Sequence, residues 1–91
     1  MISDKLFNEL KDKAIEIWQG YDDTYGYASE EIARVQEIPN VADNYGGIIW
    51  MFDHTNQRKL YNLVSDESKK LIDDWVGGLD RIEAMAKELG L

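Results

Sequence analysis

Apolar residues recur at three- and four-residue spacing along most of this 91-residue chain, which is the pattern of amphipathic helices. The first such stretch opens with Ser3, a favoured helix cap, and Asp4, whose charge suits the positive end of a helix dipole. Its apolar stripe then continues through Phe7, Leu10, Ala14, Ile17 and Trp18. We therefore expect a helix that begins at about Asp4.

The same period continues past two glycines, Gly20 and Gly26. Residues at intervals of seven remain apolar or aromatic through this region, namely Phe7, Ala14, Tyr21, Ala28 and Val35. Because a loop has no reason to keep this phase, the pattern predicts one long helix from Asp4 to Glu37. It is weakened or bent near the glycines, since each costs a helix about 1 kcal/mol relative to alanine. The alternative is two helices joined by a loop, with the second capped by Ser29.

Pro39, the only proline, ends this first unit because it disfavours helical geometry in the residue before it. From Val41 to Val64 a helical stripe resumes, with an interruption at the polar residues 53–59 and a possible restart of the helix at Asp53 or Thr55. The run Ile48–Phe52 also has strand-like composition, but one short strand would lack a partner. We therefore expect a helix here as well.

The last unit begins at Ser65 and carries acidic residues in its first turn. Its stripe keeps phase through Gly77 and Gly78 and stops at Gly90. The chain as a whole is predicted to be all-α: a single domain over residues 1–91, built as a small helical hairpin or three-helix bundle with a long first helix. The chain reversal is expected at Pro39.

Charge and composition then exclude several classes of function. Ten basic against 18 acidic residues give a net charge of −8, which argues against direct nucleic-acid binding. Cysteine is absent and His54 is the only histidine, so thiolate chemistry and His- or Cys-rich metal sites are not expected. The longest apolar run is far shorter than the ~20 residues that span a bilayer, and the N-terminus has no apolar signal core. We expect a cytoplasmic protein with no membrane association.

No motif for catalysis or cofactor binding is present. An EF-hand loop centred on Gly26 fails because Asp23 alone supplies a carboxylate at the required positions. His54 follows Asp53, but neighbouring residues on a helix point in different directions, so a hydrolytic triad is not expected. The sequence contains no phosphate-binding glycine loop, nucleophile elbow or dinucleotide fingerprint. We predict no enzymatic activity, no metal and no cofactor.

Two aromatic residues lie off the apolar stripes, Tyr27 and Trp50, whereas most of the others lie in phase with them and are expected in the core. Outward aromatic side chains are the usual anchors of protein interfaces. Four carboxylates near the first of them offer a charged complement to a basic partner: Asp22, Asp23, Glu30 and Glu31. These six residues are the predicted partner-binding site.

The favoured function is thus a non-enzymatic, acidic protein–protein interaction module whose partner is a larger protein with a basic surface. In size, acidity and lack of cysteine the chain is similar to small phage-encoded proteins that bind and block host factors. That likeness implies an inhibitor or adaptor of a larger host enzyme or defence complex, acting in the host cytoplasm.

Two other functions remain open. One is an oligomeric sponge for an anionic nucleotide, held by His54, Arg58, Lys59 and Tyr61. The other is a structural or assembly subunit, or a weak DNA mimic with rows of carboxylates along its first helix. Because long helices bury their stripes poorly in a monomer of this size, homo-oligomers are expected under each of these functions.

Overall fold

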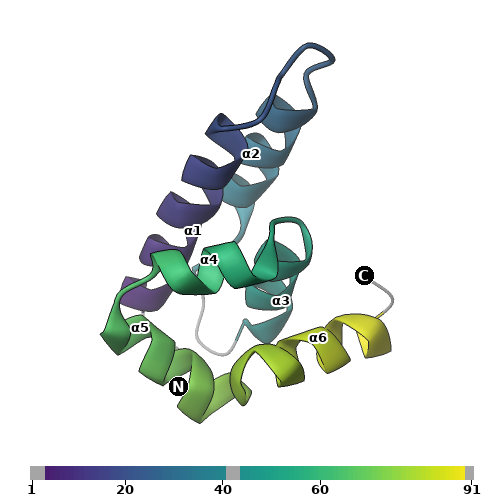
Figure 1. Cartoon of the computed structure of the whole chain (residues 1–91). Coiled ribbons are helices and arrows are strands. Elements are labelled where there is room, and N and C mark those ends of the chain that lie inside the picture. Colours follow the sequence, from purple (N-terminus) through teal and green to yellow (C-terminus); the bar gives the residue numbers. More distant parts are fainter. Residues whose placement is uncertain (1–3, 41–43, 90–91) are drawn as a thin grey trace.

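The computed structural model describes residues 4–40 and 44–89, and in these residues every regular element is a helix. The elements in order are α1 (Asp4–Gln19), α2 (Tyr27–Glu37), α3 (Tyr45–Asp53), α4 (Gln57–Leu63), α5 (Asp66–Leu71), the π-helical turn η1 (Ile72–Val76) and α6 (Gly78–Leu89) (Figure 1). The all-α prediction is confirmed. The predicted cap Ser3, the residue Val41 and the predicted stop Gly90 lie outside the described residues.

The first unit is a helical hairpin, so the prediction of one helix from Asp4 to Glu37 is wrong. Helix α1 ends at Gln19, and α2 runs back beside it after a loop that projects from the rest of the molecule (Figure 1). Gly26, directly before α2, has a left-handed φ of 78°, which breaks the helical path. The chain therefore reverses in this loop, earlier than the predicted reversal at Pro39.

The continuous period has a different cause from the one expected. Phe7 and Ala14 on α1 and Ala28 and Val35 on α2 are all buried, whereas Tyr21 between them is half exposed. Two antiparallel helices that face the same core each carry an apolar stripe, and the loop length happens to keep the two stripes in phase. The two-helix alternative is correct, but the cap residue is Gly26 rather than Ser29, and the Ser29 N–H in the first turn donates to Asp23 Oδ1 at 3.1 Å.

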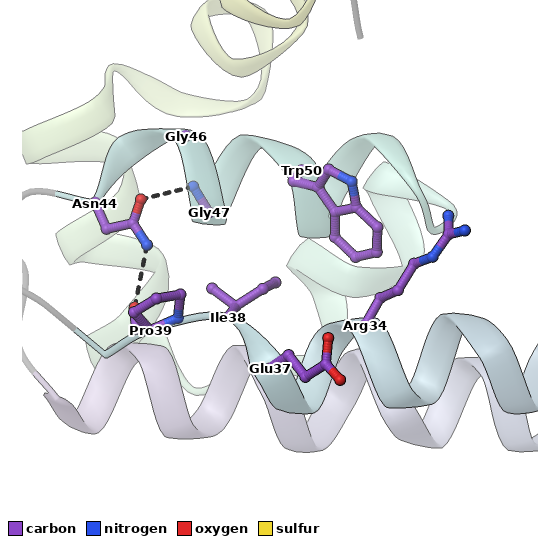
Figure 2. Close-up of a pocket in the computed structure, with 8 residues that line it drawn as sticks. All are labelled: Arg34, Glu37, Ile38, Pro39, Asn44, Gly46, Gly47 and Trp50. Carbon is purple, nitrogen blue, oxygen red and sulfur yellow. Dashed lines mark hydrogen bonds between the residues drawn. The ribbon is translucent and has the colours of Figure 1, made fainter.

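The stretch from 44 to 64 forms two helices, broken where the polar interruption predicted a break. Asn56 caps α4 by accepting the Lys59 N–H at 3.1 Å, so the helix restarts there and not at Asp53 or Thr55. Asn44 caps α3: its side chain accepts the Gly47 N–H at 3.0 Å and donates to the Pro39 carbonyl at 3.1 Å (Figure 2). This side chain fixes the start of α3 against the end of the first unit.

The last unit begins at Ser65 as predicted, because the Ser65 Oγ accepts the Ser68 N–H at 3.2 Å and caps α5. The prediction of an unbroken helix through the glycine pair is wrong. Helix α5 widens into η1, and Gly77 and Gly78 both have positive φ, 94° and 83°. A continuous helix cannot pass two left-handed residues, so α6 leaves in a new direction. The three long elements expected are instead six shorter α-helices and one π-helical turn in the described residues.

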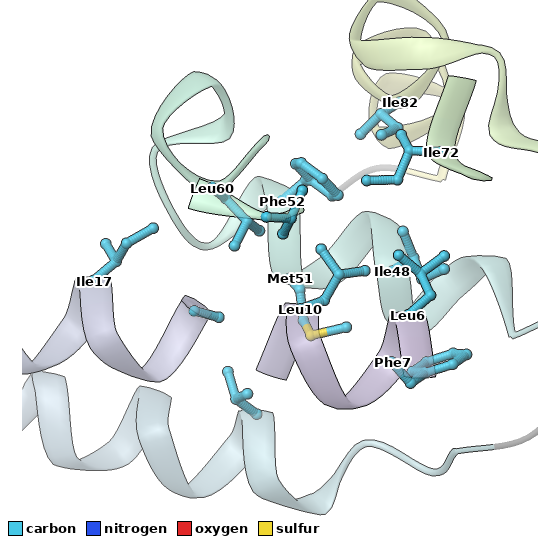
Figure 3. Packing of buried hydrophobic residues seen from close by; sticks show 13 residues of the cluster. Leu6, Phe7, Leu10, Ile17, Ile48, Met51, Phe52, Leu60, Ile72 and Ile82 are labelled. Atoms are coloured by element: carbon cyan, nitrogen blue, oxygen red, sulfur yellow. The ribbon is translucent and has the colours of Figure 1, made fainter. Parts of the chain in front are cut away.

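The core lies at the end of the hairpin away from its loop. Helix α3, the most apolar of the helices, is central there and packs against α1, α4 and α6 (Figure 1). Figure 3 shows the buried cluster, whose members come from six helical elements and from Val64, the residue after α4: Leu6, Phe7, Leu10, Ala14, Ile17, Val35, Ile48, Met51, Phe52, Leu60, Val64, Ile72 and Ile82. No helix in the described ranges has the length and apolar character needed to cross a membrane.

Candidate functional site

The loop end of the hairpin carries the most exposed large aromatic side chains of the described residues. Within this hairpin tip (residues 20–30), the exposed fractions are 52% for Tyr21, 83% for Tyr25 and 67% for Tyr27. The rings of Tyr25 and Tyr27 lie 6.3 Å apart, and the Tyr21 ring lies 5.0 Å from that of Trp18. The tip thus presents a tyrosine surface to solvent.

Hydrogen bonds that two carboxylates accept hold the backbone of the tip in one conformation. Asp22 Oδ1 accepts from the Thr24 N–H at 3.0 Å and from the Thr24 hydroxyl at 2.6 Å. Asp23 accepts the Ser29 hydroxyl and the Ser29 N–H, and these bonds hold the pKa of the Asp23 carboxyl below its usual value. The backbone that carries the tyrosines is therefore held in place by hydrogen bonds within the tip itself.

The tip is strongly acidic. It contains Asp22, Asp23 and Glu30 and no lysine or arginine, so it carries three negative charges within eleven residues. All three carboxylate side chains belong to exposed residues. An aromatic surface with this charge is complementary to a basic surface.

A cleft lies beside the tip, between the end of α1, the side of α2 and the turn from α3 to α4. This Trp18 cleft has a volume of about 380 Å³ and is lined by Trp18, Tyr21, Glu31, Asp53, His54, Thr55 and Asn56. The Glu31 side chain is only 15% exposed, with Oε1 3.5 Å from Arg34 and Oε2 3.2 Å from His54 Nδ1. His54 Nε2 lies 4.0 Å from Asp53, and its ring stacks on Trp50 at 4.0 Å.

Two buried polar atoms of the Trp18 cleft have no hydrogen-bond partner in the described part of the chain. They are the indole donor Trp18 Nε1 and the carboxylate acceptor Glu31 Oε2. Most buried polar groups in proteins are paired, because an unpaired one loses its hydration without compensation. In the described residues the indole N–H thus has no acceptor, and the Glu31 oxygen has an ion-pair contact with His54 but no hydrogen bond, which marks the cleft as a candidate binding site.

A second hollow of about 430 Å³, the α2–α3 groove, is lined by Trp50 (Figure 2), whose ring stacks on His54 of the Trp18 cleft. Its lining includes Arg34 and Glu37 on α2 and Trp50 on α3, and Asn44 ties its far end together. The Asn44 amide is already satisfied within the chain, so this groove shows less unmet hydrogen-bonding capacity than the Trp18 cleft.

The structure divides the six predicted partner-binding residues between three places. Tyr27, Asp22, Asp23 and Glu30 lie together at the hairpin tip. Glu31 lines the Trp18 cleft, and Trp50 is half-buried against the core and lines the α2–α3 groove beside the last turn of α2. The two predicted anchors, Tyr27 and Trp50, therefore do not form one surface.

The residues of the nucleotide alternative do not converge. His54 faces the Trp18 cleft, while Arg58 and Lys59 are exposed on α4. The Tyr61 hydroxyl donates to the Asp73 carboxylate at 3.0 Å, and partial burial together with this carboxylate raises the pKa of Tyr61. The four residues are thus spread over separate surroundings.

Sequence reasoning missed Tyr21 and Tyr25, which it placed on the buried stripe, and Trp18 and Asp53, which line the cleft. The loop chemistry of Asp22–Thr24 next to Gly20 was the signal that could have exposed the two tyrosines. Among residues 4–40 and 44–89 no three His, Asp or Glu side chains are grouped to hold a metal ion. Comparison of the chain with protein-family models, curated proteins and solved structures found no match.

Proposed function

We propose that this chain is a non-enzymatic interaction module that binds a partner protein with a basic surface through its hairpin tip. One observation carries the proposal: Tyr21, Tyr25 and Tyr27 are 52%, 83% and 67% exposed in the acidic hairpin tip. Tyrosine is among the residues most enriched at the energetic centres of protein interfaces, because it combines large contact area with a polar end.

The order of the loop favours binding. The side chains of Asp22 and Asp23 hold the backbone of the tip through hydrogen bonds to Thr24 and Ser29. A loop that is already ordered loses less conformational entropy when a partner binds. The bound shape of the tip is therefore expected to resemble the free one.

The charge of the tip indicates the kind of partner. Three carboxylates without a neighbouring lysine or arginine in residues 20–30 attract a basic surface and speed its approach at low ionic strength. We further propose that binding blocks or adapts a larger host enzyme or defence complex in the cytoplasm, which agrees with the small size and the net charge of −8. Whether the chain also forms homo-oligomers stays a prediction.

The test is affinity capture from a lysate of the source organism, with the wild type and tip variants immobilised at equal density. The double variant Tyr25→Ser/Tyr27→Ser should lose the partner, because it removes the two most exposed anchors. Glu30→Lys should weaken capture, while Glu83→Lys, the same change on an exposed residue of α6, should not. Partner recovery that is equal for the wild type and both tip variants would refute the proposal.

A further inference from the structure

We propose that the Trp18 cleft is a pocket for an arginine side chain, which the partner bound at the hairpin tip inserts. The proposal rests on the proposed function for the source of the arginine. Tyr21 belongs to both surfaces, since it is half exposed at the tip and lines the cleft. A partner seated on the tip therefore reaches the mouth of the cleft without a change in the hairpin.

Hydrogen bonding identifies the first requirement on the ligand. Glu31 is 85% buried as a side chain, and its Oε2 has no hydrogen bond within the described residues although His54 Nδ1 lies 3.2 Å away. Its other oxygen lies near Arg34 at 3.5 Å. A buried carboxylate oxygen without a donor binds an N–H group strongly, and most strongly when that group is charged. The ligand must therefore bring a donor.

Charge narrows the ligand to a cation. Glu31 and Asp53 place two carboxylates on the lining of the cleft, and the described lining residues include no lysine or arginine. The one basic residue there, His54, lies between these carboxylates and stacks on Trp50. Arg34 lies 3.5 Å from Glu31 and offsets one of the two carboxylate charges, and the charge that remains attracts a cation and repels an anion.

The aromatic walls favour guanidinium over ammonium. The rings of Trp18 and Tyr21 lie 5.0 Å apart at an angle of 41°, and both residues line the cleft. A planar guanidinium group stacks on an aromatic face while its N–H groups bind a carboxylate in the plane of the guanidinium, and an ammonium group cannot do both. The cleft is therefore suited to arginine.

The buried indole nitrogen of Trp18 distinguishes arginine in a peptide from a free guanidinium ion. Trp18 Nε1 is a buried donor that requires an acceptor, and a guanidinium ion has none. An arginine residue in a peptide carries main-chain carbonyl groups that can accept this N–H. Peptide-borne arginine should therefore bind the cleft more tightly than the free guanidinium ion.

The experiment titrates the full chain with N-acetyl-arginine amide, with N-acetyl-lysine amide and guanidinium chloride at matched ionic strength as comparisons. Binding is located by the indole N–H resonance of Trp18 and measured by calorimetry. We expect a saturable shift of this resonance and weaker binding of both comparison compounds. Glu31→Gln and Asp53→Asn should each raise the Kd about tenfold, since each removes a charged acceptor. Glu83→Gln, which removes an exposed carboxylate on α6, should leave the Kd unchanged.

Trp18→Phe keeps an aromatic ring in the cleft and removes the indole N–H. It should therefore weaken the binding of N-acetyl-arginine amide but not the binding of the guanidinium ion. Melting curves identify any variant that does not fold. The titrations of the wild type with the three compounds test the proposal even if a variant does not fold. The proposal fails if the Trp18 resonance does not move saturably, or if the lysine compound binds as tightly as the arginine compound. If the arginine compound does not bind while capture still depends on Tyr25 and Tyr27, the cleft proposal alone is refuted. If the arginine compound binds but the tip variants capture the partner as well as the wild type does, the proposed function is refuted and the assignment of the cleft as an arginine pocket is retained.

Discussion

Both ends of the α1–α2 hairpin carry large apolar or aromatic side chains, but these are buried at the base and exposed at the tip. At the base, Leu6, Phe7 and Leu10 are at most 1% exposed, because α3, α4 and α5 pack across α1 there. At the tip, the tyrosines at 21, 25 and 27 are between 52% and 83% exposed. The apolar spacing of the base continues as far as Tyr21, but Tyr21 and Tyr25 lie in the loop between α1 and α2, so spacing alone does not decide which side chains are buried.

The base of the hairpin stabilises the fold, whereas the tip is available for binding. The base buries apolar surface that folding requires, whereas the tip exposes aromatic surface that folding does not use. Residues at the base should therefore affect the free energy of unfolding, and residues at the tip should affect binding alone. The following changes test that division, beginning with the largest expected effect.

Phe52→Ala and Tyr25→Ala are the most direct pair, because each truncates one aromatic side chain. Phe52 is fully buried in the cluster of Figure 3, and its truncation should lower the free energy of unfolding by about 3–5 kcal/mol. Tyr25 is 83% exposed, and its truncation should change that free energy by no more than about 0.5 kcal/mol. Urea denaturation followed by circular dichroism measures both. A loss at Tyr25 close to that at Phe52 would abolish the distinction between the two ends.

Gly47→Ala and Gly46→Ala form a second pair, on α3 where it meets the first unit. A Cβ at Gly47 would lie 2.8 Å from Ile38 Cγ2 and 2.7 Å from the Asn44 amide nitrogen, so the variant should lose about 1–3 kcal/mol of stability. A Cβ at Gly46 meets nothing closer than 3.9 Å, and this variant should gain up to about 1 kcal/mol from helix propensity. Thermal unfolding of both variants shows the sign. Opposite signs are expected, and a stabilising Gly47→Ala would refute the close approach of α3 to Ile38.

Glu9→Gln tests a polar tie at the base, where the Glu9 carboxylate accepts hydrogen bonds from Ser65 and from the Ser68 hydroxyl at 2.6 Å. Partial burial alone raises the pKa of Glu9, but the bonds from Ser68 and Ser65 outweigh it and hold that pKa below the usual 4.5. The ionised form therefore stabilises the fold above about pH 4.5, and this contribution is lost as the pH falls through the lowered pKa.

Unfolding curves between pH 6 and pH 3 measure this effect. The wild type should be more stable than Glu9→Gln at the upper end, and the two stabilities should converge as the pH falls, since ∂ΔG/∂pH follows the protons taken up on unfolding. Ser68→Ala should show a smaller version of the same difference. Stabilities that differ by a constant amount at every pH would show that the hydrogen bonds do not favour the ionised form.

Local signals in the sequence predicted much of this fold. The Ser65 cap and the interruption between Ile48–Phe52 and Leu60 follow from capping preferences and from a gap in the apolar stripe. The break at Gly77–Gly78 was not predicted, because an unbroken stripe does not reveal a positive φ at two glycines. The hairpin was likewise not predicted, because the length of the loop keeps the apolar stripes of α1 and α2 in phase.

The candidate site was harder to predict, and for a physical reason. Tyr27 lies off the stripe and was predicted to point outward, whereas Tyr21 keeps the spacing of the stripe but lies in the loop after α1, where it is half exposed. The Trp18 cleft joins residues from α1, α2 and the turn after α3. No spacing along the chain brings Trp18, Glu31 and His54 together, so only the folded structure shows their unpaired atoms.

Site-specific photo-cross-linking tests the central claim, that the tip is the binding surface, most directly. A photoreactive phenylalanine analogue replaces Tyr25 in one variant and the exposed residue Ala84 of α6 in another, and each is irradiated in lysate of the source organism. A cross-link from position 25 to a basic protein, with none from position 84, is the predicted result. A cross-link to that protein from position 84 and none from position 25 would contradict it.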